Sequence, residues 1–519
     1  MTGSDRPDIL IVIADQLTTA AMPFHGNDVT QAPAMAGLGE SGVVFDNAYT
    51  ASPLCTPARA SLMTGLLPSN SHTYDNAAGF SSELPTFAHH LRNAGYRTVL
   101  SGKMHFCGPD QLHGFEERLT TDIYPADYDW TPDWDTEERP HWYHDMSSVT
   151  DAGVTVRTNQ LDFDDEVAYA AERGLFEHIR SGDDRPFCFV VSFTHPHDPY
   201  ATPQEYWDRY DDADIPMPVH GYDAAITHPH DERLRAVCAM DDVEVTDQMV
   251  RDARHAYLGG VSYVDDHLQR LLEILRVTGR LDNTVVVLTS DHGDMQGERG
   301  LWYKMSFYEG SARVPLVVSA PGRFAASHVT SPVSTMDLLP TLVGIAGGDD
   351  VAVGEDLDGE SLMPLLRGDH DAREVVVGQY LAEGAVAPIV MYRRGSWKLI
   401  HSPVDPDQLF DLATDPLERD NRADDPEAAG ILASLRAAVA DRFDLDRIDA
   451  EVRESQRRRR VVAHAHTVGR PPEWDFSPPY DAAHRYIRNH TDLGDLEAMA
   501  RYPSVRDRDP DRDAPPSGQ

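Results

Sequence analysis

Lysine is nearly absent from this chain of 519 residues, which has only Lys103, Lys304 and Lys398. Arginine therefore supplies most of the 45 positive charges, which stand against 86 negative ones, and the formal net charge is −41. A surface this acidic repels phosphate, so it disfavours binding to nucleic acid or to an anionic membrane. Because salt screens the self-repulsion of such a surface, we also expect a halophilic protein from a salt-rich cytosol.

Cysteine and long apolar runs are scarce as well. The four cysteines lie far apart and form no Cys-x-x-Cys pair, which disfavours a structural zinc site and indicates a reducing compartment. No apolar run is long enough to span a membrane, and the run at 8–14 is too short for a secretory signal peptide. We therefore expect a cytoplasmic protein.

Short Val- and Ile-rich runs alternate with helical patterns through the first 370 residues. Strands are expected at 8–14, 97–101, 187–194, 284–290 and 315–319. Helices are expected at 33–41, 58–65, 84–94, 164–180, 247–277 and 335–346. This alternation predicts an α/β fold whose large mixed, mainly parallel sheet is sandwiched by helices.

Three regions are expected along the chain. Residues 1–370 form the main domain, with a Trp-rich insertion at about 120–160 that lacks a clean period. Residues 371–450 change to β-type segments followed by a helix near 426–443, which predicts a smaller α+β domain. Residues 451–519 are expected to form a C-terminal arm with a basic run at 457–460 and a disordered end.

Metal-ligand residue types follow two of the expected strands. Asp15 and Gln16 come directly after the first strand, and Asp291 and His292 follow the strand at 284–290. Ligands in open α/β sheets bind at the carboxyl ends of the strands, so the two pairs can converge on one divalent cation such as Ca²⁺ or Mn²⁺. Each pair alone also fits helix capping by the aspartate.

Cations and imidazoles follow the other strands. Lys103 and His105 come after the strand at 97–101, His197 follows the strand at 187–194, and Lys304 lies in the glycine-bounded loop at 300–310. A lysine ammonium can bind a phosphate or sulfate oxygen as a point charge. The alternative is that the histidines are structural and that Lys304 lies in a solvated loop.

The string Cys55-Thr-Pro-Ala-Arg59 is a weak signal by itself, since a buried thiol beside a turn would explain it. Together with the strand-end motifs, in this order along the chain, it resembles the type I sulfatases of the alkaline phosphatase superfamily. Within that family the strings at 74–78, 108–127, 194–200 and 297–302 are most similar to those of choline sulfatases. One departure is Gly494, where that group tends to carry an acidic residue.

The resemblance implies an alkaline phosphatase-like fold and hydrolysis of a small sulfate ester, here choline-O-sulfate. It implies that a formylglycine-generating enzyme converts Cys55 to formylglycine, whose hydrated aldehyde attacks sulfur beside a divalent metal, most simply Ca²⁺. The metal ligands that it implies are Asp15, Gln16, Cys55, Asp291 and His292.

The resemblance also assigns roles to single residues. Arg59 would orient the formylglycine, Lys103 and Lys304 would hold the sulfuryl oxygens, and Asn76 would donate to one of them. His197 would be the general acid and His105 the base. For the quaternary ammonium of choline, aromatic faces and a carboxylate are needed, and the candidates are Trp130, Tyr143, His144 and Glu383.

Further expectations concern assembly and rival activities. In choline sulfatases the C-terminal tail helps to cover a neighbouring subunit's site, so the resemblance implies a homo-oligomer, a dimer or a tetramer. The rival functions are a phosphonate or phosphate monoester hydrolase and a sulfatase for another small alcohol. A catalytically silent binding module is disfavoured, because it has no need of the lysine and histidine set.

Overall fold

An eight-stranded sheet forms the centre of the molecule in a computed structural model that describes residues 6–136, 144–211, 213–223, 227–347, 356–369, 373–480 and 492–503. The strand order is β11-β2-β10-β9-β1-β7-β4-β5. Only β10 runs antiparallel to its neighbours, β2 and β9. The strands are β1 (Asp8–Ala14), β2 (Val43–Phe45), β4 (Arg97–Gly102), β5 (Glu117–Arg118), β7 (Phe187–Phe193), β9 (Thr284–Thr289), β10 (Leu316–Ser319) and β11 (Ser327–Val329).

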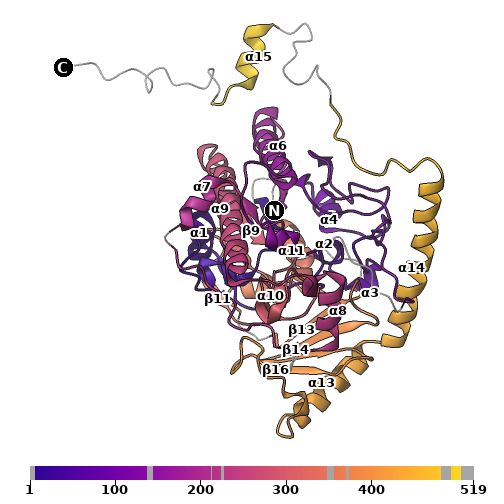
Figure 1. Ribbon diagram of the computed structural model, residues 1–519. Helices are drawn as coiled ribbons and strands as arrows, with labels where there is room; N and C mark the ends of the chain where they lie inside the picture. Colours follow the sequence, from indigo (N-terminus) through magenta and orange to yellow (C-terminus); the bar gives the residue numbers. More distant parts are fainter. Residues whose placement is uncertain are drawn as a thin grey trace.

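Helices cover both faces of this sheet (Figure 1). Leu10, Val12 and Ala14 of β1 point into one apolar layer, which is covered by α1 (Pro33–Ser41), α6 (Asn159–Ser181) and α9 (Asp247–Val277). The alternate residues of β1 point into the opposite layer. That layer is covered by α2 (Cys55–Thr64), α4 (Phe87–Asn93) and α11 (Leu338–Gly347). Since both faces are buried, the strands are apolar throughout, and the predicted fold class is confirmed.

The four strands that matter for the chemistry are neighbours in the sheet. β9, β1, β7 and β4 run parallel, so their carboxyl ends meet at one edge. Most predicted boundaries are within one residue of the observed strands. The helix predicted at 58–65 instead begins at Cys55, because a proline in the first turn of a helix, here Pro57, is tolerated.

A second, antiparallel sheet follows in the chain and lies below the first in Figure 1. It contains β13 (Val375–Tyr380), β14 (Ile389–Arg394), β15 (Trp397–His401) and β16 (Gln408–Asp411), with α13 (Ala429–Arg442) packed on it. Its buried residues join the same apolar layer as α9. The small sheet is therefore fixed against the main one.

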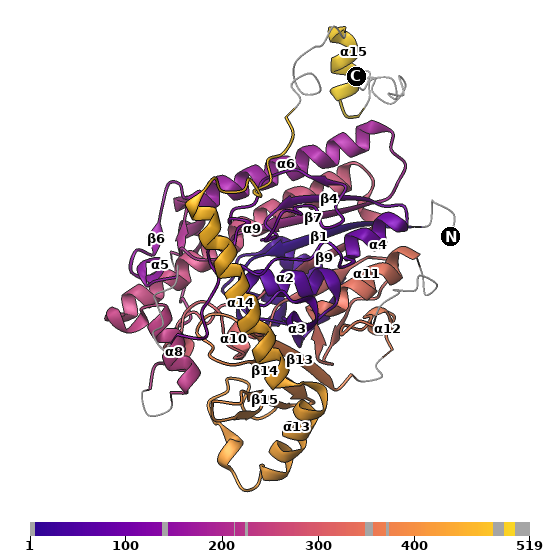
Figure 2. The same ribbon diagram turned by 90° about the vertical axis from the view of Figure 1, so that its right-hand side faces the viewer.

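The C-terminal region begins with a long helix, α14 (Leu445–Val468), which starts six residues before the expected arm. Figure 2 shows α14 running from the small sheet along the side of the molecule toward α6. The short helix α15 (Leu493–Ala500) lies beyond α6, whose Arg180 donates to Ala500 O. Residues 504–519, where we expected a disordered end, lie outside the described residues.

The other elements are short. Among the described residues, no helix is both long and apolar enough to span a bilayer. The remaining helices are α3 (Pro68–Ser71), α5 (Ser147–Thr150), α7 (Gln204–Trp207), α8 (Pro229–Val237), α10 (Glu309–Ala312) and α12 (Met363–Leu366). The remaining strands are β3 (Ala48–Tyr49), β6 (Gly153–Val154), β8 (Ala201–Thr202) and β12 (Val333–Ser334).

All three lysines of the chain are buried, which is unusual for this residue type. Lys398 on β15 joins the two sheets. Its Nζ donates to Phe307 O at 2.8 Å and pairs with Glu309 Oε1 at 2.6 Å and Glu418 Oε1 at 2.5 Å. A single buried cation therefore compensates the buried carboxylate of Glu418 and the partly buried carboxylate of Glu309 at the junction.

Replacing Lys398 by methionine should lower the free energy of unfolding by about 3–5 kcal/mol, because two carboxylates lose their partner inside the protein. The midpoint of urea unfolding measures this change. Arg447→Gln is the matched control, since its pair with Glu451 lies on the surface, and the expected loss is below ~0.5 kcal/mol. Equal shifts for the two variants would contradict the role of Lys398 as the junction cation.

Candidate active site

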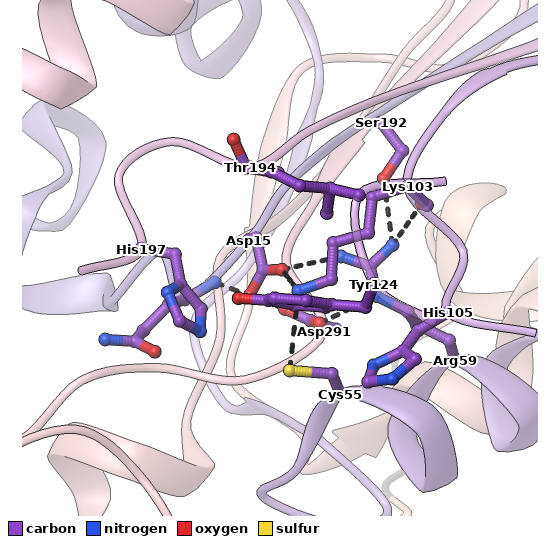
Figure 3. Close-up of polar contacts among 12 residues, drawn as sticks. Asp15, Cys55, Arg59, Lys103, His105, Tyr124, Ser192, Thr194, His197 and Asp291 are labelled. Atoms are coloured by element: carbon purple, nitrogen blue, oxygen red, sulfur yellow. Dashed lines mark hydrogen bonds and ion pairs between the residues drawn. The ribbon is translucent and has the colours of Figure 1, made fainter. Parts of the chain in front are cut away.

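Cys55 lies at the start of α2, at the carboxyl edge of the large sheet (Figure 3). All ten residues of this helix are buried. The backbone N–H of Thr56 donates to Asn76 Oδ1 at 3.0 Å, so Asn76 satisfies one of the amides left open at the helix N-terminus. The partial positive charge of that terminus favours an anion beside Cys55.

Four predicted metal ligands converge next to Cys55. One ligand atom from each of Asp15, Cys55, Asp291 and His292 lies within 4.8 Å of the others, and all four residues are buried. Asp15 Oδ1 has no hydrogen-bond partner among the described residues, so a buried carboxylate oxygen is left over. His292 Nδ1 faces Gly293 O at 3.1 Å, which leaves Nε2 toward the cluster. This donor set fits a divalent cation.

Gln16, the fifth predicted ligand, lies beside the cluster. Its backbone N–H donates to Asp291 Oδ1 at 3.2 Å. Its side-chain Oε1 accepts from Lys304 Nζ at 2.8 Å, and Nε2 donates to Asp294 Oδ2 at 2.7 Å. In this arrangement the amide of Gln16 connects the carboxylate cluster to Lys304.

Arg59 holds the carboxylates in place from inside α2. Its Nε donates to Asp291 Oδ2 at 2.8 Å and its Nη2 to Asp15 Oδ2 at 3.2 Å. Its Nη1 donates to Lys103 O at 2.6 Å and to Ser192 Oγ at 2.8 Å. Burial lowers the pKa of Arg59, but Asp291 and Asp15 outweigh it and raise the pKa above its ordinary value. The guanidinium thus ties the ends of four strands, β1, β9, β4 and β7, to the helix of Cys55.

Lys103 lies between Asp15 and Cys55. Its Nζ forms an ion pair with Asp15, approaches Cys55 Sγ to 3.5 Å and lies 4.4 Å from the centre of the Tyr124 ring. Burial lowers the pKa of Lys103, but Asp15 raises it further, so the ammonium stays charged. Burial raises the pKa of Asp15, but the charges of Lys103 and Arg59 outweigh burial and hold this pKa well below its ordinary value.

The two predicted proton-transfer histidines flank Cys55 in Figure 3. His197 Nε2 lies 2.6 Å from Lys304 Nζ, and its Nδ1 lies 2.6 Å from Asp198 O. Burial and the charge of Lys304 hold the pKa of His197 well below its ordinary value. The ring of His105 packs against Tyr124, and burial lowers its pKa although Cys55 opposes the shift. Both rings are therefore neutral at pH 7.

The predicted alcohol-binding residues lie on loops. The Trp130 ring packs edge-on against His105, 5.7 Å between centres. His144 stacks on Tyr303 at 4.5 Å and its Nδ1 lies 3.3 Å from Asp198 Oδ2. Glu383 is buried, and neither carboxylate oxygen has a hydrogen-bond partner within the described ranges. Tyr143 lies outside the described residues.

Two residues of the site were not expected from the sequence. Asp198 accepts from Ser148 Oγ at 3.0 Å and lies within 3.3 Å of both His144 and His197. Tyr124 packs under Lys103 and beside His105. The signal for Asp198 was its place directly after His197, whereas Tyr124 lies in the aperiodic insertion and gave none.

Comparisons with known proteins agree with this geometry. Residues 7–348 match the family model "Sulfatase", 450–502 match "Choline sulfatase enzyme C terminal" and 297–443 match "N-sulphoglucosamine sulphohydrolase, C-terminal". The chain is 47% identical to a choline-sulfatase of Rhizobium meliloti, over 96% of this chain and 99% of that protein. It is 27% identical to an arylsulfatase of Clostridium perfringens, over 80% of this chain and 90% of that protein.

Solved structures show the same fold. A phosphonate monoester hydrolase of Agrobacterium radiobacter superposes with a TM-score of 0.67 at 22% identity, covering 84% of this chain and 95% of that one. The protein BT4656, solved in complex with its substrate D-glucosamine-2-N,6-O-disulfate, gives a TM-score of 0.66 at 24% identity, covering 86% of this chain and 98% of that one. At this level of identity the likeness concerns the fold alone.

The carboxylate cluster predicts that Asp291→Asn loses a bound divalent cation, because the variant removes one negative ligand. Elemental mass spectrometry after dialysis should find about one ion per wild-type chain and less than about a tenth of that in the variant. Asp337→Asn is the control, since this buried carboxylate pairs with Arg373 outside the cluster. Full metal content in Asp291→Asn would contradict the assignment.

Proposed function

The chain belongs to the sulfatase family, and from that premise we propose that it hydrolyses choline-O-sulfate to choline and sulfate. The observation that carries the choice of alcohol is Glu383, a buried carboxylate with no hydrogen-bond partner for either oxygen among the described residues. A quaternary ammonium has no N–H to donate, so it is recognised by aromatic faces and by an unpaired negative charge. Trp130 and His144 are the aromatic groups that we assign to it.

Three positive side chains would hold the sulfate end. Arg59, Lys103 and Lys304 are buried around Cys55, where fixed positive charge stabilises the charge that develops on sulfuryl oxygens. Lys103 and Lys304 would contact those oxygens, while Arg59 orients position 55 through Asp15 and Asp291. Asn76 Oδ1 is occupied by the Thr56 amide, so its contribution to a sulfate oxygen would come from its Nδ2 group.

Two components that the family implies would complete this site. A formylglycine made from Cys55 by a formylglycine-generating enzyme supplies a hydrated aldehyde, whose hydroxyl is the nucleophile toward sulfur. A divalent cation held by Asp15, Gln16, Asp291, His292 and residue 55 supplies positive charge beside that hydroxyl, and the oxygen-rich donor set favours Ca²⁺ over Mn²⁺.

Proton transfer is assigned to the histidines. Neutral His197 accepts from Lys304 through Nε2 and donates through Nδ1 to Asp198 O. The negative charge of an arriving sulfate ester raises the pKa of His197 and favours the protonated form, which can donate to the leaving alcohol. His105 is neutral on the other side of Cys55 and can accept the proton that must leave for sulfate to be released.

The surroundings of the protein are also part of the proposal. We propose a cytoplasmic, halophilic enzyme, since the described surface carries no lysine and the chain has a large excess of acidic residues. We further propose a homo-oligomer assembled through the C-terminal region, where Val461, Val468 and Met499 are at least 60% exposed. We also propose three regions along the chain: a main domain at 1–370, a smaller domain at 371–450 and a C-terminal arm at 451–519.

The substrate proposal is tested by comparing kcat/KM for choline-O-sulfate, 4-nitrophenyl sulfate and a phenylphosphonate monoester. Choline-O-sulfate should be preferred by about 100-fold over the neutral aryl sulfate, because only it places a cation beside Glu383. Mass spectrometry of the peptide containing position 55 should show a loss of about 18 Da relative to cysteine.

Three outcomes would contradict parts of this proposal. Preference for the phosphonate would favour the rival phosphonate or phosphate monoester hydrolase. Preference for the neutral sulfate would leave a sulfatase for another alcohol. Unmodified Cys55 in fully active protein would exclude the formylglycine nucleophile.

The buried position of Glu383 predicts a pH dependence of substrate choice. Burial raises the pKa of Glu383 to about 8, with Asp75 adding to the shift, so the free enzyme gains the negative charge only as the pH rises. The ratio of kcat/KM for choline-O-sulfate to that for 4-nitrophenyl sulfate should therefore increase through about pH 8. Groups that act on both substrates change both kcat/KM values with pH in the same way, so their titration does not affect this ratio.

Glu383→Gln should remove this rise and lower the ratio by about tenfold or more at pH 9, because the amide carries no charge at any pH. The side chains are similar in size, so packing is kept. A variant that retains the wild-type pH profile would show that Glu383 does not face the cationic alcohol.

A further inference from the structure

The basic face of α14 packs against the acidic insertion of the main domain. Four of its buried residues, Ile448, Val452, Gln456 and Arg459, recur at helical spacing and form one face. Neighbouring arginines pair with the insertion: Arg453 and Arg457 with Asp135, and Arg460 with Asp133. The basic run at 457–460, which the proposed chemistry does not use, is therefore a contact surface within the chain.

Arg459 is the most buried cation of this face. Its Nη1 and Nη2 donate to Asp75 Oδ1 and Oδ2 at 2.7 and 2.6 Å, a bidentate pair in which both side chains are buried. Nη1 also donates to Thr131 Oγ1 at 3.1 Å. One guanidinium thus connects the residue before Asn76 with the residue after Trp130.

Two more side chains of α14 hold the same region. Gln456 Oε1 accepts from the Trp134 backbone N–H at 2.9 Å. Arg453 donates to Trp134 O at 2.8 Å and to Val386 O at 2.7 Å. The Trp134 indole in turn donates to Ala382 O at 3.0 Å, next to Glu383. In Figure 2, α14 crosses the molecule beside α2 and α3.

Trp130 and Glu383, which we assign to the alcohol, and Asn76, which we assign to a sulfate oxygen, lie on three segments without helix or strand. Such segments have no backbone ladder to fix them, so their relative positions depend on side-chain contacts. Each of the three receives a contact from α14, directly or through Trp134. The residues next to Cys55 differ, because Asp15, Lys103 and Asp291 follow buried strands and Cys55 itself begins α2.

From this arrangement we infer that Arg459 is a positioning residue for alcohol selectivity, which it sets within its own subunit by holding the loops of Asn76 and Trp130 together. This inference rests on the proposed function, whose substrate preference it explains. Arg459 contacts neither Cys55 nor the buried carboxylate cluster in any described interaction, so it acts through Asp75 and Thr131. Small displacements of binding groups have large effects on turnover.

The test compares selectivity, defined as the ratio of kcat/KM for choline-O-sulfate to kcat/KM for 4-nitrophenyl sulfate, in full-length variants. Arg459→Lys keeps the buried positive charge but cannot form the bidentate pair and reach Thr131 together. It should lower the ratio by about tenfold, mainly through a higher KM for choline-O-sulfate. Thr131→Val removes one contact and leaves the Asp75 pair, and should lower the ratio by about threefold.

Arg458→Lys is the matched control, because Arg458 lies on the same helix with 75% of its side chain exposed and pairs only with Glu454 among the described contacts. Its ratio should equal that of the wild type. Loss of folded enzyme lowers both kcat/KM values equally, so a purely structural role leaves the ratio unchanged. A ratio within about twofold of wild type in Arg459→Lys would overturn the inference.

The wild-type measurement keeps the two proposals apart. If the wild-type enzyme itself shows no preference for choline-O-sulfate, the proposed function fails. If the wild type prefers it and Arg459→Lys keeps the full preference, only the role of Arg459 fails.

Discussion

The buried ion pairs of Arg59 with Asp15 and Asp291 are the interaction on which the site depends. They join α2, which carries Cys55, to the ends of β1 and β9, and the same guanidinium reaches Ser192 at the end of β7 and Lys103 O after β4. All of these side chains are inaccessible to water. A buried charge is tolerated only when an opposite charge is held beside it. The strand ends hold the two carboxylates in place, and Arg59 compensates the cost of burying them.

The distribution of lysine follows from the same constraint. Two of the three lysines lie in the site and the third compensates two carboxylates between the sheets. Lys103 contacts Asp15 and Cys55, and Lys304 contacts Gln16 and His197. A lysine ammonium is a compact charge, whereas the planar guanidinium of arginine needs more room. No lysine lies on the described surface, where arginines can bind carboxylates with two hydrogen bonds, as Arg276 does with Glu273.

The sequence predicted which strand-end residues lie together at the sheet edge, but not the contacts that hold the loops around Asp75 and Trp130. Asp15, Lys103 and Asp291 each follow an apolar run, and parallel strands carry such residues to one edge whatever the details of packing. Asp75 and Arg459 are 384 residues apart in the sequence, and the local hydrophobic pattern cannot predict a contact between them. The long helix at Leu445–Val468 was missed because two residues of its buried face, Gln456 and Arg459, are polar. Their burial is compensated by tertiary partners that the local pattern cannot show.

The two ends of the site are held in different ways. The groups around Cys55 are anchored on the large sheet, so they cannot move without breaking buried ion pairs. The loops around Trp130 and Glu383 are held by side chains of α14, and changes in those contacts leave the sheet intact. The groups around Cys55 and the loops of Trp130 and Glu383 are therefore held by different parts of the fold, the first by the large sheet and the second by α14.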